Sequence, residues 1–176
     1  MRIKGIDFIE FITEEQIQEK IKNLATQINI AYEGKTPVFL PVLNGSFMFA
    51  ADLLKNISVP SRVSFVKVSS YEGQSSTGQL KTIIGLDESL FQQDVLVVED
   101  IVDTGLTLTR IVDELKGLGT RSVEVISLLR KTAAREKGIP VRFTGFDIGK
   151  EFVLGYGLDY DGLGRNHRRL YQAVGK

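Results

Sequence analysis

Three acidic residues follow a short apolar run in the segment Val95–Leu108, VLVVEDIVDTGLTL. The run predicts a buried strand, with Glu99, Asp100 and Asp103 at its end and a helical pattern directly behind them. In open parallel sheets, ligands bind beyond the carboxyl ends of the strands, and N–H groups at a following helix N-terminus attract anions. Acids would repel a bare phosphate there, but they suit sugar hydroxyls or a divalent cation such as Mg²⁺. The segment therefore predicts a phosphate and metal site whose use it leaves open.

The apolar periodicity predicts the elements that must hold these acids in place. Helices are expected from the Thr13 capping box to near Gly34, over Phe47–Leu54 and over Thr104–Leu118. Strands are expected over Pro37–Leu43, Arg62–Ser69, Lys81–Gly85, Asp94–Asp100, Ser122–Leu129, Val141–Ile148, Phe152–Leu154 and Leu170–Val174. Alternation of strands with helices is typical of parallel units, so we expect an α/β fold with helices on both faces of the sheet. With 176 residues and no linker, the chain is expected to form a single domain over residues 1–176.

Composition removes several classes of function. Lys plus Arg and Asp plus Glu are each 22, and this zero net charge argues against a general nucleic-acid binder, which usually has a basic face. The absence of cysteine excludes disulfides, thiolate metal sites and cysteine nucleophiles, and the single histidine, His167, argues against histidine catalysis. The N-terminus lacks the apolar core of a signal peptide, and no segment is apolar enough for a membrane span. We therefore expect an intracellular, cytoplasmic protein.

The segment Val95–Leu108 resembles the phosphoribosyl-pyrophosphate motif of the type I phosphoribosyltransferases. Four further segments, in the order found in that family, resemble the hypoxanthine and hypoxanthine-guanine phosphoribosyltransferases: Leu43–Ser46, Ser69–Tyr71, Leu129–Lys131 and Glu151–Asn166. The resemblance covers nearly the whole chain. It implies the type I fold, in which a central, mostly parallel twisted sheet is flanked by helices. It also implies a small hood made from the N- and C-terminal segments, and a flexible lid loop.

The resemblance also implies a reaction. The enzyme would be a purine-salvage transferase that converts hypoxanthine, and guanine as well, with 5-phosphoribosyl 1-pyrophosphate into IMP or GMP and pyrophosphate. N9 of the 6-oxopurine would displace pyrophosphate from the anomeric carbon, with Mg²⁺ as cofactor. The implied partners are therefore small molecules, without nucleic acid or membrane, and the implied assembly is a homodimer or homotetramer. The apolar helix expected over Phe47–Leu54 could form a subunit contact or simply cover the sheet.

Each residue of the sugar and phosphate side matches a position of the family's motifs. Glu99 and Asp100 would hold the ribose hydroxyls close to magnesium. The 5'-phosphate would be wrapped by Thr104, Gly105, Leu106 and Thr107. The pyrophosphate would be contacted by Asn44, Gly45 and Arg165, under a lid that includes Ser70 and Tyr71. Composition alone would favour an ordinary surface loop for this segment.

The purine side depends on residues that carry weaker local signals. Asp103 would lie beside N7 of the base, where it could accept a proton or only orient the ring. Lys131 would donate to the oxygen at C6, although an isolated lysine is more often a surface residue. Phe152 would stack on the purine, and Val153 would offer backbone groups to the purine edge. Asp159 would lie near the 2-position and, with Glu99 and Asp100, near the metal.

The chain departs from the family pattern at two positions. Asn44 stands where many members carry a lysine in the pyrophosphate loop, so this loop would act mainly through backbone N–H groups. Leu106 replaces a basic residue of some relatives, at a position that would act through its backbone. The family also implies a cis peptide bond between Leu43 and Asn44, a bond type that is rare outside proline.

Two other functions stay open from the sequence. A sibling enzyme could prefer xanthine, because contacts at the 2-position involve backbone groups and water. A regulator with the same fold could bind RNA or DNA instead, but it should show a basic face, and it could lack parts of the catalytic set. The neutral charge and the presence together of the acids, Lys131, Phe152 and Arg165 favour the enzyme.

Overall fold

A seven-stranded sheet forms the centre of the computed structural model, which describes residues 1–70, 80–84, 88–138 and 140–174. The strand order is β6-β5-β3-β7-β8-β9, and β4 pairs with the start of β3. The pairs β3–β4, β3–β5, β3–β7, β7–β8 and β8–β9 are parallel, whereas β6 is antiparallel to β5. The bounds are β3 Val38–Leu43, β4 Arg62–Val63, β5 Val66–Ser70, β6 Leu80–Ile84, β7 Asp94–Val102, β8 Ser122–Lys131 and β9 Phe143–Ile148. The expected mostly parallel α/β sheet is confirmed.

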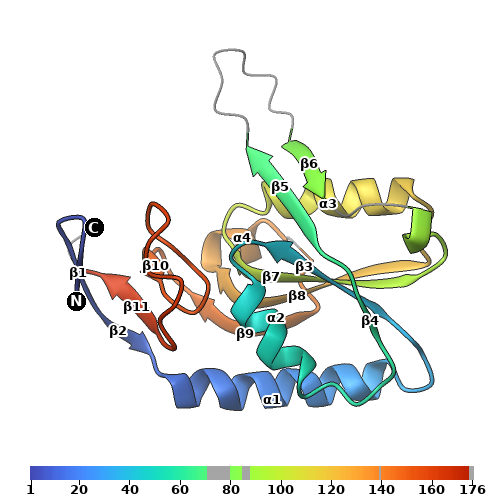
Figure 1. Ribbon diagram of the computed structural model, residues 1–176, viewed down its shortest axis with the longest axis horizontal. Helices are drawn as coiled ribbons and strands as arrows, with labels where there is room; N and C mark the ends of the chain where they lie inside the picture. Colours follow the sequence, from blue (N-terminus) through green and yellow to red (C-terminus); the bar gives the residue numbers. More distant parts are fainter. Residues whose placement is uncertain (71–79, 85–87, 139, 175–176) are drawn as a thin grey trace.

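Helices cover both faces of this sheet (Figure 1). Their bounds are α1 Glu14–Ala31, α2 Phe47–Leu54, α3 Leu106–Gly117 and α4 Thr132–Glu136, with a short 3-10 helix at Glu88–Leu90. Alternate residues of β7 point to opposite faces. Leu96 and Val98 pack with α1 and α2, whereas Val95 and Val97 pack with α3 and α4. Because both faces are covered, the central strands are apolar almost without interruption.

Helix α1 begins where the sequence predicts. The Thr13 side chain accepts a hydrogen bond from the Gln16 N–H, and the Gln16 side chain accepts one from the Thr13 N–H, which completes the capping box. The side chains buried against the sheet recur at helical spacing: Ile17, Ile21, Leu24 and Ile28. This spacing gives α1 one apolar face. The helix ends at Ala31, three residues before Gly34.

A second, four-stranded antiparallel sheet forms the predicted hood and lies to the left in Figure 1. Its order is β1-β2-β11-β10, with bounds β1 Arg2–Ile3, β2 Ile6–Ile12, β10 Val153–Leu154 and β11 Leu170–Ala173. Strand β11 pairs with both β2 and β10, so the first and last segments of the chain are held together. Val153 of β10 and Asp100 of β7 line the same cavity, so the hood places β10 beside the edge of the main sheet where the acids of β7 lie.

Several boundaries differ from the sequence prediction. The expected strand over Arg62–Ser69 is divided into β4 and β5, which pair with different parts of β3. Strand β7 continues to Val102, two residues past the predicted end at Asp100, so Glu99 and Asp100 lie within the strand as predicted. Helix α3 begins at Leu106 and not at Thr104, because Gly105 has a left-handed φ of 76° that no helical residue adopts. Helix α4 and the β1–β2 hairpin have no counterpart among the predicted elements.

Among the helices of the described residues, none is long and apolar enough to cross a membrane.

Candidate active site

Three neighbouring strands bring the predicted site residues to one edge of the sheet. The loop Asn44–Ser46 follows β3, the loop Asp103–Gly105 follows β7, and Lys131 is the last residue of β8. Because β3, β7 and β8 are adjacent and parallel, their carboxyl ends meet at the same edge. Residues far apart in the sequence therefore become neighbours at the place where α/β sheets bind ligands.

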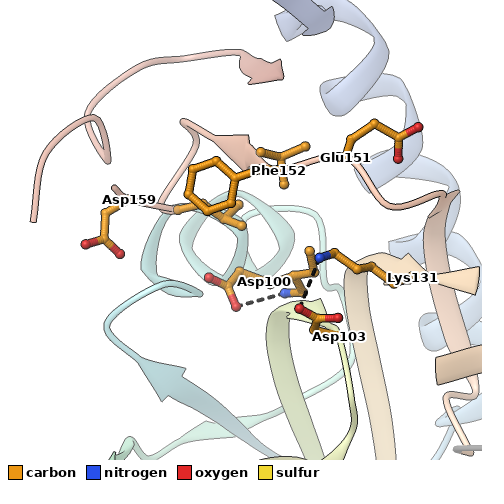
Figure 2. A pocket seen from close by; sticks show the side chains of 9 residues that line it. Asp100, Asp103, Lys131, Glu151, Phe152 and Asp159 are labelled. Carbon is orange, nitrogen blue, oxygen red and sulfur yellow. Dashed lines mark hydrogen bonds and ion pairs between the residues drawn. The ribbon is translucent and has the colours of Figure 1, made fainter. Parts of the chain in front are cut away.

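A cavity of about 230 Å³ opens between this edge and the hood. Its lining residues are Asp100, Ile101, Asp103, Lys131, Glu151, Phe152, Val153, Leu158 and Asp159. In Figure 2 the Phe152 ring faces Asp100, Asp103 and Lys131 across the cavity. The space therefore combines an aromatic wall with a charged floor, which suits a flat ligand with polar edges.

An ion pair joins the two residues predicted to contact the polar edge of the base. The Lys131 Nζ donates to Asp103 Oδ2 at 3.0 Å. The lysine side chain is only 18% exposed, whereas the Asp103 side chain is 56% exposed. Lys131 is therefore not the ordinary surface lysine that composition favours. The pair presents a cationic donor and a carboxylate acceptor side by side toward the cavity (Figure 2).

A second cavity of about 110 Å³ is formed by the loop Asp103–Gly105 and the start of α3. It is lined by Glu99, Ile101, Val102, Asp103, Thr104, Gly105, Leu106, Thr107 and Leu108, which include every residue predicted to hold the 5'-phosphate. The left-handed Gly105 turns the chain into α3, so the first N–H groups of that helix face the loop. The Leu106 side chain is apolar and 69% exposed, so only the backbone of this residue can contact an anion in the cavity. This geometry is suited to an anion.

Burial perturbs the two acids at the end of β7. Glu99 is only 7% exposed, and this burial, together with the adjacent Asp100 charge, raises its pKa well above the usual value. Burial also raises the pKa of Asp100 to about 6, against the opposing effect of the Ile101 N–H, which donates to Asp100 Oδ1 at 2.8 Å. Two adjacent acids with poorly solvated charges favour a cation or hydroxyl donors close by.

The shift of Asp100 predicts a pH-dependent stability difference between wild type and Asp100→Asn. An acid whose pKa is raised on folding contributes stability that is fully present below the unfolded value, 3.8, and is lost as pH rises through about 6. The amide carries no charge and can keep the bond from Ile101. We therefore expect the stability of Asp100→Asn relative to wild type to increase between about pH 4 and pH 7. Thermal unfolding across that range measures it, and a difference that stays constant or falls would contradict the assignment.

The loop after β3 is packed directly against Asp100. The Leu43–Asn44 peptide bond is cis, as the family resemblance implies. A Cβ built on Gly45 would lie 1.6 Å from Asp100 Oδ2, so only glycine lets the carboxylate lie against this backbone. The buried Ser46 hydroxyl donates to the Val42 carbonyl at 2.7 Å and anchors the other side of the loop. The loop predicted to bind pyrophosphate is therefore fixed next to the acid predicted to bind the sugar.

Arg165 forms an ion pair with Asp159, one of the residues that line the cavity. Arg165 Nη2 is 2.6 Å from Asp159 Oδ1, and Arg165 Nη1 donates to the Gly157 carbonyl at 2.7 Å. The second carboxylate oxygen of Asp159 accepts from the Gly162 N–H at 2.7 Å. The Arg165 charge also acts on Asp100 and partly offsets the effect of its burial. The guanidinium thus lies close enough to influence Asp100 of β7.

The aromatic wall is supported by the hood. The Phe152 ring lies 5.5 Å from the Tyr160 ring in an edge-on arrangement and 6.2 Å from the Phe8 ring, measured between centroids. The Phe152 carbonyl accepts from the Ala173 N–H at 2.9 Å, and Val153 is paired with Gln172 in β11. These contacts hold the ring over the cavity without burying it completely.

The acids of this site fit Mg²⁺ by chemistry, because hard cations prefer oxygen ligands. Within the described part of the chain, no group of three or more Asp, Glu or His side chains is arranged to hold a metal by itself. Glu99, Asp100 and Asp159 therefore do not form a complete protein cage. This fits Mg²⁺, which usually keeps waters and shares one or two carboxylates with substrate phosphates.

Three cavity residues escaped the sequence prediction: Ile101, Leu158 and Glu151. Ile101 and Leu158 are apolar and carry no local sign of contact with a ligand. Glu151 stands within a segment that resembles the family, yet it has no predicted role. Its Oε2 is buried and has no hydrogen-bond partner among the described residues, and its carboxylate points away from Asp103 and Lys131 (Figure 2).

The predicted lid lies mostly outside the described residues. Ser70 is the last residue of β5, and Tyr71 belongs to the range 71–79, which is not described. Its role stays a prediction.

Comparison with known proteins identifies the class that this fold and site define. A family model described as "Phosphoribosyl transferase domain" matches residues 12–161. The chain belongs to the phosphoribosyltransferase family.

Individual relatives show which kind of phosphoribosyltransferase the chain resembles. The hypoxanthine-guanine phosphoribosyltransferase of Bacillus subtilis is 39% identical over 156 residues, which are 88% of this chain and 87% of that protein. A bifunctional protein TilS/HprT of Listeria innocua is 42% identical over 156 residues, but the chain spans only 24% of its length. A crystal structure of a hypoxanthine-guanine phosphoribosyltransferase from Bacillus anthracis, with HEPES in the active site, superposes with a TM-score of 0.88 and 38% identity. That alignment covers 96% of this chain and 99% of the other.

Proposed function

We propose that this protein transfers the phosphoribosyl group of 5-phosphoribosyl 1-pyrophosphate to N9 of hypoxanthine, and of guanine, to form IMP or GMP and pyrophosphate. The observation that carries the proposal is the Lys131–Asp103 pair, which faces Phe152 across one cavity and adjoins the start of α3, where the first N–H groups of the helix suit an anion. Relatives named hypoxanthine-guanine phosphoribosyltransferase, which this chain matches over most of their length, support the same reaction.

The polar edge of a 6-oxopurine matches the ion pair. Lys131 donates to the oxygen at C6, and Asp103 accepts the hydrogen of N7 when the base carries it there. The lone pair of N9 then forms the bond to the anomeric carbon as the bond to pyrophosphate breaks. The N7 proton passes to Asp103, so the purine ring of the product nucleotide is neutral. Phe152 stacks on one face of the ring, and Val153 offers its backbone to the edge.

The sugar diphosphate occupies the other side of the site in this proposal. The loop Thr104–Thr107 holds the 5'-phosphate through N–H groups and hydroxyls. Glu99 and Asp100 accept from the ribose hydroxyls and stabilise the positive charge that develops on the ring. The backbone of Asn44 and Gly45, together with Arg165, receives the leaving pyrophosphate. Mg²⁺, bound beside Asp100 and Asp159, would neutralise charge on the diphosphate.

The direct test is nucleotide formation from 5-phosphoribosyl 1-pyrophosphate with hypoxanthine, guanine, xanthine and adenine in separate reactions, with and without Mg²⁺. We expect turnover of hypoxanthine and guanine, dependence on Mg²⁺, and little turnover of adenine, whose 6-amino group offers no acceptor to Lys131. Faster turnover of xanthine than of hypoxanthine would assign the chain to a xanthine-preferring enzyme. Absence of product from every 6-oxopurine would refute the proposal.

Replacing Lys131 with alanine should weaken recognition of the base more than recognition of the sugar. We expect kcat/KM for hypoxanthine to fall about 30-fold, because a hydrogen bond from a charged donor contributes roughly 2 kcal/mol. The KM for 5-phosphoribosyl 1-pyrophosphate should change by less than about threefold. Steady-state kinetics with each substrate varied in turn measures both values. Arg130→Ala is the control, since Arg130 pairs with Asp147 and does not line the cavity. Equal losses for the two substrates would mean that Lys131 does not read the base.

Assembly as a homodimer or homotetramer and a cytoplasmic location stay predictions. Phe47, at the start of α2, is 43% exposed, which is compatible with the proposed subunit contact.

A further inference from the structure

A short turn connects the two halves of the site. It consists of Gly155, Tyr156 and Gly157, which follow β10 and precede Leu158 and Asp159. All three residues have positive φ, at 103°, 47° and 102°. Tyrosine rarely adopts this conformation, which persists only where the surroundings enforce it. Something outside the turn must therefore hold Tyr156.

Tyr156 is held by its hydroxyl. The side chain is 1% exposed, and the hydroxyl donates to Asp52 Oδ2 at 2.6 Å. Gln18 Nε2 donates to the same oxygen at 2.8 Å, and Lys55 Nζ donates to Asp52 Oδ1 at 2.9 Å. Asp52 lies on α2 and Gln18 on α1. The turn is thus fastened to the two helices that cover one face of the main sheet.

The protonation states support this bond. Burial, followed by the bond to Asp52, raises the pKa of the Tyr156 hydroxyl, so it remains a donor at physiological pH. Burial opposes ionisation of Asp52, but the bonds from Tyr156, Lys55 and Gln18 outweigh it and lower the pKa of the carboxyl. The Asp52 group is therefore an ionised acceptor, and bonds to charged groups are the stronger ones.

The same turn is in contact with the loop after β3. A Cβ built on Gly157 would lie 2.0 Å from the Gly45 carbonyl oxygen, so the two backbones are in close contact. The Gly157 N–H donates to the Arg165 carbonyl at 2.9 Å, and the Gly157 carbonyl accepts from the Arg165 guanidinium at 2.7 Å. Any shift of Tyr156 would move Gly157 and, with it, both the Gly45 loop and Arg165.

We propose that Tyr156, through its bond to Asp52, is a positioning residue that sets the spacing between the base-binding side and the pyrophosphate-binding side of the site. The proposal rests on the function proposed above. Phe152 and Val153 precede the turn in sequence and Asp159 follows it, while Gly45 packs against its last residue, Gly157. Displacements of catalytic or binding groups by about 1 Å can lower rates by about 100-fold. Loss of the bond between Tyr156 and Asp52 should therefore affect the use of both substrates.

The test compares two buried tyrosines whose hydroxyls each donate to a carboxylate, one beside the proposed site and one far from it. Tyr32 is 3% exposed, and its hydroxyl donates to Glu124 Oε2 at 2.7 Å, near the amino end of β8 and therefore at the opposite edge of the sheet. Tyr156→Phe and Tyr32→Phe each remove one buried O–H···carboxylate bond. Both should lower Tm by a similar few degrees. Only Tyr156→Phe should raise KM for hypoxanthine and for 5-phosphoribosyl 1-pyrophosphate, each by about fivefold or more.

A second pair of variants tests the acceptor and remains informative if Tyr156→Phe does not fold. Asp52→Asn keeps an oxygen for the Tyr156 hydroxyl and should stay within about threefold of wild type in both KM values, whereas Asp52→Ala should resemble Tyr156→Phe. Kinetic constants within about twofold of wild type for Tyr156→Phe, or for Asp52→Ala where Tyr156→Phe does not fold, would overturn the proposal. A KM change in Tyr32→Phe as large as that in Tyr156→Phe would overturn it too. A wild-type protein without transferase activity would instead reject the proposed function.

Discussion

Asp103→Asn is expected to lower kcat for IMP formation about 100-fold or more, because removing a general base typically costs 10²–10⁴ in rate. The amide has nearly the size of the carboxylate and can still accept from Lys131, which lies 3.0 Å away. It cannot take the N7 proton. The loss should therefore fall on kcat, with KM for hypoxanthine changed by less than about threefold.

The matched control for this variant is Asp147→Asn. Asp147 also pairs with a basic residue of β8, Arg130, at 2.7 Å, but it does not line the cavity. Measurement of kcat and KM over pH 6 to 9, for wild type and for both variants, separates the two roles left open for Asp103. An increase in KM with kcat retained would show that Asp103 only orients the base. Unchanged turnover at every pH would remove Asp103 from proton transfer.

Gly45→Ala should be the most damaging substitution of a residue without a functional side chain. The new methyl group would overlap Asp100 Oδ2 at 1.6 Å and Asp100 Cγ at 2.5 Å, so the carboxylate must rotate away. That rotation breaks the bond from the Ile101 N–H and moves an acid proposed to bind the ribose. We expect kcat/KM for 5-phosphoribosyl 1-pyrophosphate to fall about 100-fold, as expected for misplacement of a positioned group by about 1 Å.

Two further variants test the cause of that loss. Gly117→Ala adds a methyl group on α3 with nothing within 4 Å, so activity should be unchanged and Tm unchanged or slightly raised. In an Asp100→Ala background, Gly45→Ala should cost little more, since the group it displaces is already gone. Additive losses in the double variant would show that Gly45 acts independently of Asp100.

Element types were largely predictable from the sequence, whereas several ends were not. The apolar spacing of α1 and its capping box place that helix correctly, because both are local properties. The continuation of β7 beyond Asp100 to Val102 was missed, because the acids at its predicted end resemble the start of a loop. Pairing with β8, which matches Ile101 to Leu129 and Val102 to Arg130, keeps these residues in the sheet. The hairpin β1–β2 was also missed, because β11 from the far end of the chain stabilises it.

The sequence by itself determined the acids and the turn at the end of β7, because Glu99 to Thr107 are contiguous and the turn and its glycine are local. Only the tertiary structure decided which distant groups meet there. Lys131 reaches Asp103 across 28 positions and Tyr156 reaches Asp52 across 104, and Gly45 lies against Asp100 because β3 and β7 are neighbours. Strand order and helix docking fix these contacts, since they arise when nonlocal apolar surfaces are buried together, and no local pattern encodes that choice.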